Sequence, residues 1–314
     1  MLEQIFQTAM LISLFSMTIR VATPVLLAAL GELIAERSGV MNLGVEGTML
    51  SGAFIGFVLL DKTASFPLAI VGAILAGGLM GALMAFMAVS MKLNQTVVGL
   101  GLNLLASGLT FYLYRISYAV EGTMEIPRIE IFQTIAIPLL SDIPFLGPIL
   151  FNQNILTYFA FLMVPVTWFV LYRTRIGLLI RGLGEHPRAV DVKGISVDKY
   201  RYLSVVFGGM MAGLGGAFLT IGSSGIFVQE ISAGRGWLAI VIVIAGNWRP
   251  GRIMFASLIF ALLDAFQLQV QAIGIQIPYQ ILLAMPYIFA ILLLMGTRAR
   301  SVPPESLGEP YSRE

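Results

Sequence analysis

Long apolar runs alternate with short polar stretches along most of the chain. About nine of them are long enough, or nearly so, to cross a bilayer as helices. They cover residues 20–33, 42–60, 66–91, 96–114, 155–172, 202–222, 237–248, 253–270 and 277–295. The first and seventh runs are the short ones. The pattern predicts an all-α polytopic membrane protein with about nine transmembrane helices, eight to ten in all.

The start of the chain allows two interpretations. Residues 2–17 are expected to form an interfacial helix that leads into the first span. Alternatively, they join that span in one long helix that is broken near Pro24, because proline removes a backbone donor and crowds the preceding turn. The N-terminus lacks a basic stretch, so a cleaved signal peptide is not expected.

Composition supports the membrane assignment and excludes several kinds of chemistry. Apolar residues make up 58% of the chain and charged residues 11%, and the mean hydropathy is +0.89. A soluble domain carries roughly twice that charged fraction. The chain has no cysteine, which excludes disulfides and thiol catalysis, and His186 is its only histidine. No resident metal is therefore expected, nor is a nucleic-acid partner, because the net charge is only +2.

The distribution of basic residues in the loops predicts the orientation. Residues 173–201 contain seven Lys or Arg and three acids, whereas residues 115–153 contain two Arg and four acids. Because basic loops stay in the cytoplasm, the first loop is expected inside and the second outside. Counting spans from there places the N-terminus outside and the C-terminus inside. Residues 1–300 then form one transmembrane domain, and residues 301–314 form a short, disordered cytoplasmic tail.

The same count suggests an internal symmetry. Residues 20–114 and 201–295 are equally long, each holds four predicted spans, and the two segments enter the membrane from opposite sides. Inverted repeats of this kind place a transport path at the repeat interface. The two sequences match poorly, so the repeat is a hypothesis from topology.

Enzyme motifs are missing from the sequence. None of the four lysines lies in a Gly-x-x-x-x-Gly-Lys-Ser/Thr phosphate-binding loop, so ATP binding of that kind is not expected in this chain. There is also no His-Glu-x-x-His and no Gly-x-Ser-x-Gly motif. No catalytic residue is assigned, and a lipid-modifying membrane enzyme has no support.

The basic loop contains a short charged helix by prediction. Pro187 and Gly194 bracket about two helical turns, and proline near a helix start with glycine after its end is the favoured arrangement. Such a helix offers a surface on which a cytoplasmic partner can act. Considered on physical grounds alone, a solvated connecting loop is an equally good interpretation.

A family resemblance favours the first interpretation. The loop resembles the Glu-x-x-x-Ala…Gly-Ile coupling segment of ATP-binding-cassette importer permeases, with Glu185, Ala189, Gly194 and Ile195 at the matching positions. Residues 31–47 are similar to the corresponding region of the branched-chain amino acid, ribose and nucleoside permease family, above all its nucleoside-uptake branch. The likeness runs from residue 20 to residue 297. The family's usual extra first helix is absent or reduced to residues 2–17.

The resemblance implies an importer of the type shared with the vitamin B12 permease, in the inner membrane of a bacterial cell. Two permease subunits, identical or paralogous, would pair around a central path. Two cytoplasmic ATPase subunits would bind ATP and Mg²⁺, and an external solute-binding lipoprotein would deliver the solute. Coupling to the ATPases is then expected at Glu185, His186, Pro187, Ala189, Gly194 and Ile195.

Polar side chains within the apolar runs are candidates for the solute path, because polar groups in hydrocarbon are costly and usually functional. They are Asn42, Glu46, Asn94, Asn103, Asn247 and Asp264. For each Asn, hydrogen bonding between helices is at least as good an interpretation. Glu46 could face a cavity at a helix break, or cap the second span near the cytoplasm. Asp264 and Gln267, three residues apart on one helix face, could line the path or bond to a neighbouring helix.

Small residues dominate one span. Gly209 and Gly213 form a Gly-x-x-x-Gly motif inside a run that contains five glycines between Gly208 and Gly216. This spacing predicts close packing against another helix. The function expected overall is import of a nucleoside or related sugar-containing solute, with branched-chain amino acids or simple sugars as alternatives. A stand-alone secondary transporter or channel would need an ion-coupling carboxylate at mid-membrane, for which Asp264 is the candidate.

Overall fold

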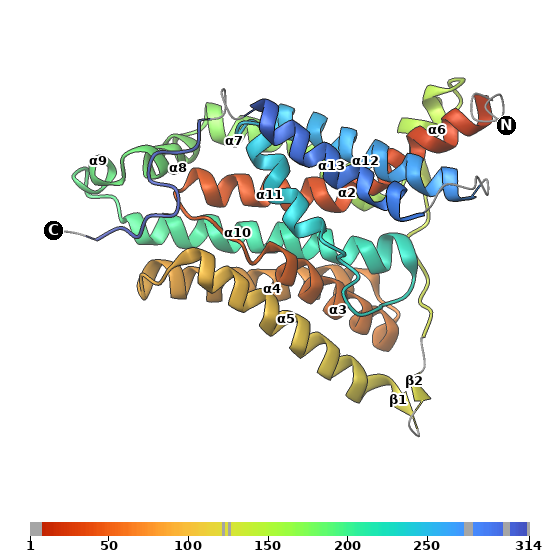
Figure 1. Cartoon of the computed structure of the whole chain (residues 1–314), viewed down its shortest axis with the longest axis horizontal. Coiled ribbons are helices and arrows are strands. Elements are labelled where there is room, and N and C mark those ends of the chain that lie inside the picture. Colours follow the sequence, from red (N-terminus) through yellow and green to blue (C-terminus); the bar gives the residue numbers. More distant parts are fainter. Residues whose placement is uncertain (1–7, 121–122, 125–126, 273–278, 298–301, 313–314) are drawn as a thin grey trace.

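The computed structural model describes residues 8–120, 123–124, 127–272, 279–297 and 302–312. Most of the long helices run along one common direction, with the N-terminus at one end of the molecule and the C-terminus at the other (Figure 1). The helices are α2 (Thr8–Arg37), α3 (Val45–Thr63), α4 (Phe66–Ala85), α5 (Gln95–Tyr118), α6 (Leu146–Leu150), α7 (Ile155–Arg173), α8 (Arg175–Glu185), α9 (Pro187–Asp191), α10 (Val197–Ala217), α11 (Arg235–Ala245), α12 (Pro250–Ala272) and α13 (Tyr279–Thr297). Two of them end in π-helical turns, α4 in η1 (Phe86–Ser90) and α10 in η2 (Phe218–Ser224).

The predicted spans agree with these helices. Within the described residues, each of the nine predicted runs overlaps a helix. Six helices, counted over the described residues, are long and apolar enough to cross a membrane: α2, α4 with η1, α5, α7, α10 with η2, and α12. Helix α11 is only 11 residues long. The chain is therefore a multi-pass membrane protein, and nine crossings stay a prediction.

The prediction of a separate interfacial helix at residues 2–17 is wrong for the residues of this range that the structure describes. Residues 8–17 belong to α2, which continues through Pro24 as one helix of 30 residues. No helix breaker separates residue 17 from residue 20, and the hydroxyl of Thr18 donates a bond of 2.8 Å back to the carbonyl of Leu14. A proline is tolerated inside such a helix because its neighbours can satisfy the freed carbonyl. Residues 2–7 lie outside the described part.

Helix α10 lies at the centre and contacts α2, α3 and α4. The close packing predicted from its glycines is confirmed. A Cβ placed on Gly213 would lie 2.5 Å from the carbonyl oxygen of Ala73, and one on Gly209 would lie 2.3 Å from that of Gly77. On another face, a Cβ on Gly216 would lie 1.8 Å from the carbonyl oxygen of Met49. Backbone therefore touches backbone on two sides of α10.

The two charged loops lie at opposite ends of the molecule, as the sequence predicts. The acidic loop forms two short antiparallel pairs, β1 (Ala119–Val120) with β2 (Thr123–Met124) and β3 (Ile135–Ala136) with β4 (Asn152–Gln153). These pairs and α6 lie at the end of the molecule that holds the N-terminus (Figure 1). The basic loop forms α8 and α9 at the other end, next to the C-terminus. We call these the N-terminal end and the coupling end.

The prediction that residues 301–314 are disordered is wrong for the residues of this range that the structure describes. Residues 302–312 run back across the coupling end. The Ser306 amide donates to the carbonyl of Gly184 (2.8 Å), and the Gly308 amide donates to the carbonyl of Gly39 (3.1 Å). Mixed charge and prolines suggest disorder when the tail is considered alone, but backbone acceptors from two distant segments hold it in place.

Candidate coupling surface and transport path

The coupling segment has the local structure that its sequence predicts. Helix α8 ends at Glu185, His186 occupies the cap position, and Pro187 opens α9 as the first helical residue. A turn follows α9 to Gly194, whose φ of +77° favours glycine. The side chains of Val190 and Ile195 face a small apolar cluster with Leu183 and Val197. The helix is therefore anchored on one face only.

The other face of this segment points away from the protein. Ala189, Lys193 and Gly194 are exposed, and Val192 is 88% exposed. A Cβ on Gly194 would meet no atom within 4 Å. Basic, apolar and glycine positions thus form an open surface with room for another protein. Of the predicted coupling residues, Glu185, His186, Ala189 and Gly194 are exposed along it, whereas Pro187 and Ile195 are half-buried and Ile195 packs against the apolar cluster.

An ion pair and a histidine–carboxylate contact connect the start of this segment to the rest of the chain. The Glu185 carboxylate lies 3.6 Å from Nη1 of Arg37 at the end of α2. Nη2 of the same arginine donates to the carbonyl of Trp248, which follows α11, at 3.0 Å. Nδ1 of His186 lies 3.4 Å from the Glu305 carboxylate in the tail, with both side chains exposed. Through Arg37, the end of α8 is linked to both α2 and the α11–α12 connection.

Deeper in the bundle, the Glu46 side chain holds the start of α11. Its two carboxylate oxygens accept hydrogen bonds from the amides of Gly234 (2.8 Å) and Gly236 (2.6 Å). A carboxylate at a helix N-terminus satisfies free amides and interacts favourably with the helix dipole. Glu46 itself lies in the first turn of α3. The starts of α3 and α11 therefore meet, and Glu46 caps α11 instead of its own helix.

Asn42 and Asn103 fix the irregular backbone between α2 and α3. The Asn103 amide nitrogen donates to the carbonyl of Leu43 (2.8 Å), and its oxygen accepts from the amide of Gly47 (2.7 Å). The Asn42 side-chain oxygen accepts from the amide of Gly44 at 2.9 Å. Both side chains satisfy backbone groups that no helix pairs. The predicted alternative of hydrogen bonding between helices therefore describes Asn103.

The other predicted path residues lie apart from these. The Asn94 oxygen accepts from the amide of Val97 (3.1 Å) near the start of α5. The Asn247 oxygen accepts from the amide of Val302 (3.2 Å), which joins the α11–α12 connection to the tail. Asp264 lies 3.9 Å from Arg235 and, with the buried Gln267, lines a cavity of about 190 Å³ beside the start of α11. The six candidates do not form one site, and among them Asp264 lines this cavity.

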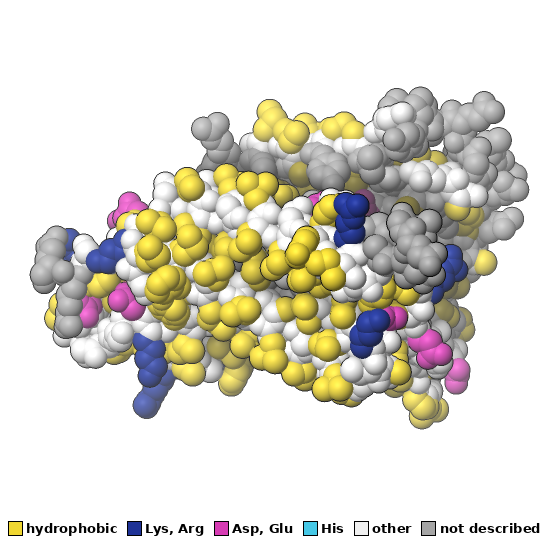
Figure 2. All heavy atoms as spheres, turned by 90° about the horizontal axis from the view of Figure 1, so that it is seen from below, with side chains coloured by type: hydrophobic (Ala, Val, Ile, Leu, Met, Phe, Trp, Pro, Cys, Tyr) yellow, Lys and Arg dark blue, Asp and Glu magenta, His cyan; other side chains and the backbone are white. Residues whose placement is uncertain are grey.

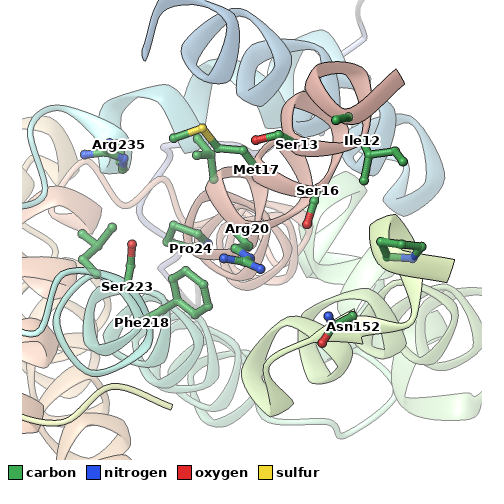
Figure 3. A pocket seen from close by; sticks show the side chains of 14 residues that line it. Ile12, Ser13, Ser16, Met17, Arg20, Pro24, Asn152, Phe218, Ser223 and Arg235 are labelled. Atoms are coloured by element: carbon green, nitrogen blue, oxygen red, sulfur yellow. The ribbon is translucent and has the colours of Figure 1, made fainter. Parts of the chain in front are cut away.

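A larger cavity of about 540 Å³ opens between α2, α6, η2 and the start of α11. Figure 3 shows Ser13, Ser16 and Arg20 from α2, Phe218 and Ser223 from η2, and Arg235 around it. Its size falls in the usual range of small-molecule sites. Because Arg235 also lines the smaller cavity with Asp264, it stands between the two.

Sequence reasoning missed both arginines of this cavity. Arg20 is exposed, and its Nε donates to the Gln153 side chain at 3.2 Å. The sequence does mark Arg20 as a candidate, because an arginine inside an apolar helix must face a partner or a water-filled space. Arg235 lies two residues before the predicted run 237–248, and only the structure shows that it opens α11. Among the described residues, no group of three or more His, Asp or Glu side chains is arranged to hold a metal ion.

Comparison with known proteins identifies the family. Residues 14–297 match the family model described as "Branched-chain amino acid transport system / permease component". The putative glucose ABC transporter permease protein TsgC13 of Haloferax volcanii is 40% identical, over 83% of this chain and 79% of its own length. The guanosine ABC transporter permease protein NupQ of Bacillus subtilis is 36% identical, over 94% of both chains. The nucleoside permease protein NupC of Lactococcus lactis is 34% identical, over 92% of this chain and 93% of its own.

No solved structure matches the chain. The family match covers most of the chain, and relatives above 30% identity align over nearly all of it. The chain belongs to this family of transport permease components.

Proposed function

We propose that this family member is the membrane-spanning subunit of an ATP-driven importer for a nucleoside or a related sugar-containing solute. The observation that carries the solute class is the alignment with the guanosine permease NupQ and the nucleoside permease NupC over more than nine-tenths of the chain. The similarity to a putative glucose permease supports simple sugars as the alternative within the family. Branched-chain amino acids are a further alternative.

The partners follow from the proposed function. ATPase subunits in the cytoplasm bind ATP and Mg²⁺ and dock on α8 and α9, because this surface is exposed, partly basic and anchored only from behind. A second permease subunit, identical or paralogous, completes the path, and an external lipoprotein delivers the solute. The coupling end then faces the cytoplasm and the N-terminal end faces outward, in agreement with the loop charges.

The interior geometry suggests where the path runs. Helices that start inside a bundle expose amide-rich ends, and transporters use such ends to bind solutes at the interface of inverted repeats. Here α3 and α11 both start inside the bundle and meet at Glu46. Each follows one of the two adjacent helices α2 and α10. This arrangement supports the inverted repeat and a vitamin-B12-permease-like architecture, with nine crossings, as parts of the proposal.

We place the outward opening of the path at the cavity beside Arg20, Phe218 and Arg235. Serine hydroxyls and guanidinium groups suit the hydroxyls and carbonyls of a nucleoside. Asp264 pairs loosely with Arg235 at the neighbouring cavity. A stand-alone secondary transporter would instead use Asp264 to couple an ion, and its uptake would not need ATP.

Uptake by the assembled system tests this function. The permease is reconstituted in proteoliposomes with its ATPase, partner permease and binding protein, and uptake of radiolabelled guanosine, ribose, glucose and leucine is measured with and without ATP. We expect saturable, ATP-dependent uptake of guanosine. If the system takes up another of these solutes but not guanosine, the proposed solute class is wrong. Uptake without ATP would refute the importer.

Two variants test the coupling surface in the same assay. Glu185→Lys should break the pair with Arg37, and deletion of residues 189–194 should remove most of the docking surface. We expect both to abolish ATP-driven uptake while the protein still inserts in the membrane. Glu130→Lys is the matched control, since Glu130 is exposed in the acidic loop at the other end of the molecule. Normal uptake by Glu185→Lys and by the deletion would refute the coupling assignment.

A further inference from the structure

The tail, defined as residues 302–312, contacts several separate segments of the coupling end. Its first residue, Val302, donates to Asn247 in the α11–α12 connection, and Ser306 donates to the carbonyl of Gly184 in α8. Further on, the Gly308 amide bonds the carbonyl of Gly39 in the α2–α3 connection. The tail therefore joins helix α8 to two connections that are far apart in the sequence.

A buried arginine fixes the far part of the tail. Arg201, near the start of α10, is 1% exposed. Its Nη1 donates to the carbonyl of Glu309 (3.0 Å), and its Nε donates to the carbonyl of Ser38 (3.2 Å). A buried charge needs such partners, because an unpaired one costs far more than it gains. The tail thus supplies an acceptor to a charge that lies inside the protein.

The tail packs closely against two glycines of the coupling end. A Cβ on Gly184 would lie 2.4 Å from the carbonyl oxygen of Arg37 and 3.1 Å from Cβ of Pro304. A Cβ on Gly39, whose φ is +91°, would lie 2.8 Å from Nη2 of Arg201 and 3.2 Å from the carbonyl oxygen of Ser306. The tail atoms therefore lie 3.1 Å and 3.2 Å from the added Cβ positions, which is tighter than ordinary van der Waals contact but looser than the backbone contacts of α10.

The end of the tail reaches α9 itself. The Tyr311 hydroxyl donates to the Asp191 carboxylate (2.9 Å) at the last residue of α9, and the Tyr311 ring packs against the cluster of Leu183, Val190 and Val197. Among the described helices, α9 contacts chiefly α8 and, to a smaller extent, α10. Tyr311 therefore adds a direct connection from α9 to the segment that holds α2, α10 and the α11–α12 connection.

We propose that the tail is a brace that transmits movement of α9 to the membrane helices, with Tyr311 as its positioning residue. This inference rests on the proposed function in one respect, since an ATPase must move α9. A displacement of α9 pulls on Asp191 and hence on Tyr311. The bonds at Glu309, Gly308 and Val302 pass the displacement to Arg201, to the α2–α3 connection and to the α11–α12 connection.

A measurement on the permease alone tests the brace without transport. The chain has no native cysteine, so Val192→Cys, at the exposed residue directly after α9, takes a single spin label. The label's mobility is compared in the otherwise unchanged chain, in Tyr311→Phe, and in a deletion of residues 302–314. We expect mobility to rise slightly in Tyr311→Phe and strongly in the deletion. Unchanged mobility in both would overturn the brace, whatever the protein transports.

The assembled transporter tests transmission. Uptake per ATP hydrolysed is measured for the same two variants, with Tyr112→Phe as the matched control, because Tyr112 is 60% exposed on α5. We expect Tyr311→Phe to lower this ratio about two- to tenfold, the equilibrium shift that one hydrogen bond produces. The deletion should hydrolyse ATP with almost no uptake.

The outcomes separate the two proposals. If the unchanged complex shows no ATP-driven uptake, the proposed function fails, and the label mobility alone decides the brace. If uptake per ATP is normal in the deletion, the brace is refuted and the proposed function stands. If the deletion no longer retains the ATPase, the tail is a docking segment, and its role in transmission is refuted.

Discussion

Helices α10 and α5 are both apolar and long enough to cross a membrane, yet they are packed in opposite ways. In the apolar part of α10 with η2, 83% of the residues are buried, against 28% for α5. Helix α10 contacts α2, α3 and α4, whereas α5 runs along the edge of the bundle and rests mainly on α3 (Figure 1). Hydropathy alone did not distinguish them.

The difference in packing between α10 and α5 depends on where each helix has small residues and which neighbours those residues contact. The glycines of α10 lie against backbone on two sides, so neighbouring helices approach closely. The buried residues of α5 follow a single stripe: Gln95, Val98, Gly99, Leu102, Ala106, Thr110, Tyr114 and Tyr118. Figure 2 shows the molecule from the α5 side, where apolar side chains form a broad exposed area. Such a face suits lipid or another apolar helix.

The largest expected effect comes from adding a side chain to a glycine of each helix. Gly213→Leu in α10 should prevent folding, because its Cβ alone would lie 2.5 Å from the carbonyl oxygen of Ala73. Gly108→Leu in α5 is the same change at a site with no atom within 4 Å of the added Cβ, and should leave the protein folded. Size-exclusion chromatography in detergent across a temperature ramp measures the folded fraction. Equal loss in both variants would contradict the comparison.

A smaller effect is expected from shortening a leucine of each helix. Leu214 in α10 is 4% exposed and Leu104 in α5 is 77% exposed. Leu214→Ala should lower the free energy of unfolding by about 2–5 kcal/mol, because it leaves a cavity in the packed centre. Leu104→Ala should change it little, since that side chain leaves no cavity. Reversible unfolding in mixed micelles measures both values.

Repeating the second measurement in the assembled complex sharpens the comparison. If Leu104→Ala leaves the free energy of unfolding of the isolated chain unchanged but lowers the stability of the complex, the exposed face of α5 contacts the partner permease. If it changes neither value, lipid covers that face. A loss of stability in the isolated chain as large as that of Leu214→Ala would contradict the packing described for α5.

The fold was predictable where one local pattern decides the structure. Apolar runs predicted the helices, the run from Gly208 to Gly216 predicted the tightly packed one, and Pro187 with Gly194 predicted α9. The ordered tail was not predictable, because its partners are backbone carbonyls of Gly184 and Gly39, which carry no sequence signal. The continuity of α2 depended on whether neighbours tolerate Pro24, which is a tertiary property.

The candidate site was less predictable than the fold. The six polar residues stand out because polar groups are rare in apolar runs, but most of them bond to backbone groups of the protein. Glu46 caps a helix that starts nearly two hundred residues later, at Gly234 and Gly236, and its role depends on the three-dimensional meeting of α3 with α11. Arg20 and Arg235 line the cavity of about 540 Å³, and Arg20 carries the same rarity signal. The rarity of polar residues thus indicates candidates, but it does not distinguish residues that line the solute path from residues that hold the backbone in place.

The smallest of the three effects concerns the polar connection of α5 to the bundle. Asn103 donates to the carbonyl of Leu43 and accepts from the amide of Gly47. Among the hydrogen bonds described for α3 and α5, these are the bonds that satisfy the two backbone groups. Asn103→Ala leaves both backbone groups unpaired in a partly buried place. We expect a loss of about 1–3 kcal/mol in the free energy of unfolding, the usual cost of unsatisfied buried groups.

A distance measurement decides whether that connection also positions α5. Spin labels at Leu104→Cys and Leu79→Cys, both exposed, report the separation of α5 from α4 in this cysteine-free chain. In Asn103→Ala the distance distribution should broaden, because α5 is held on one stripe and loses its polar attachment. Asn94→Ala removes only a cap near the start of the same helix and should leave the distribution narrow. A narrow distribution in both variants would mean that apolar packing along the stripe holds α5 without Asn103, and that the two helices differ in packing area but not in the rigidity of their attachment.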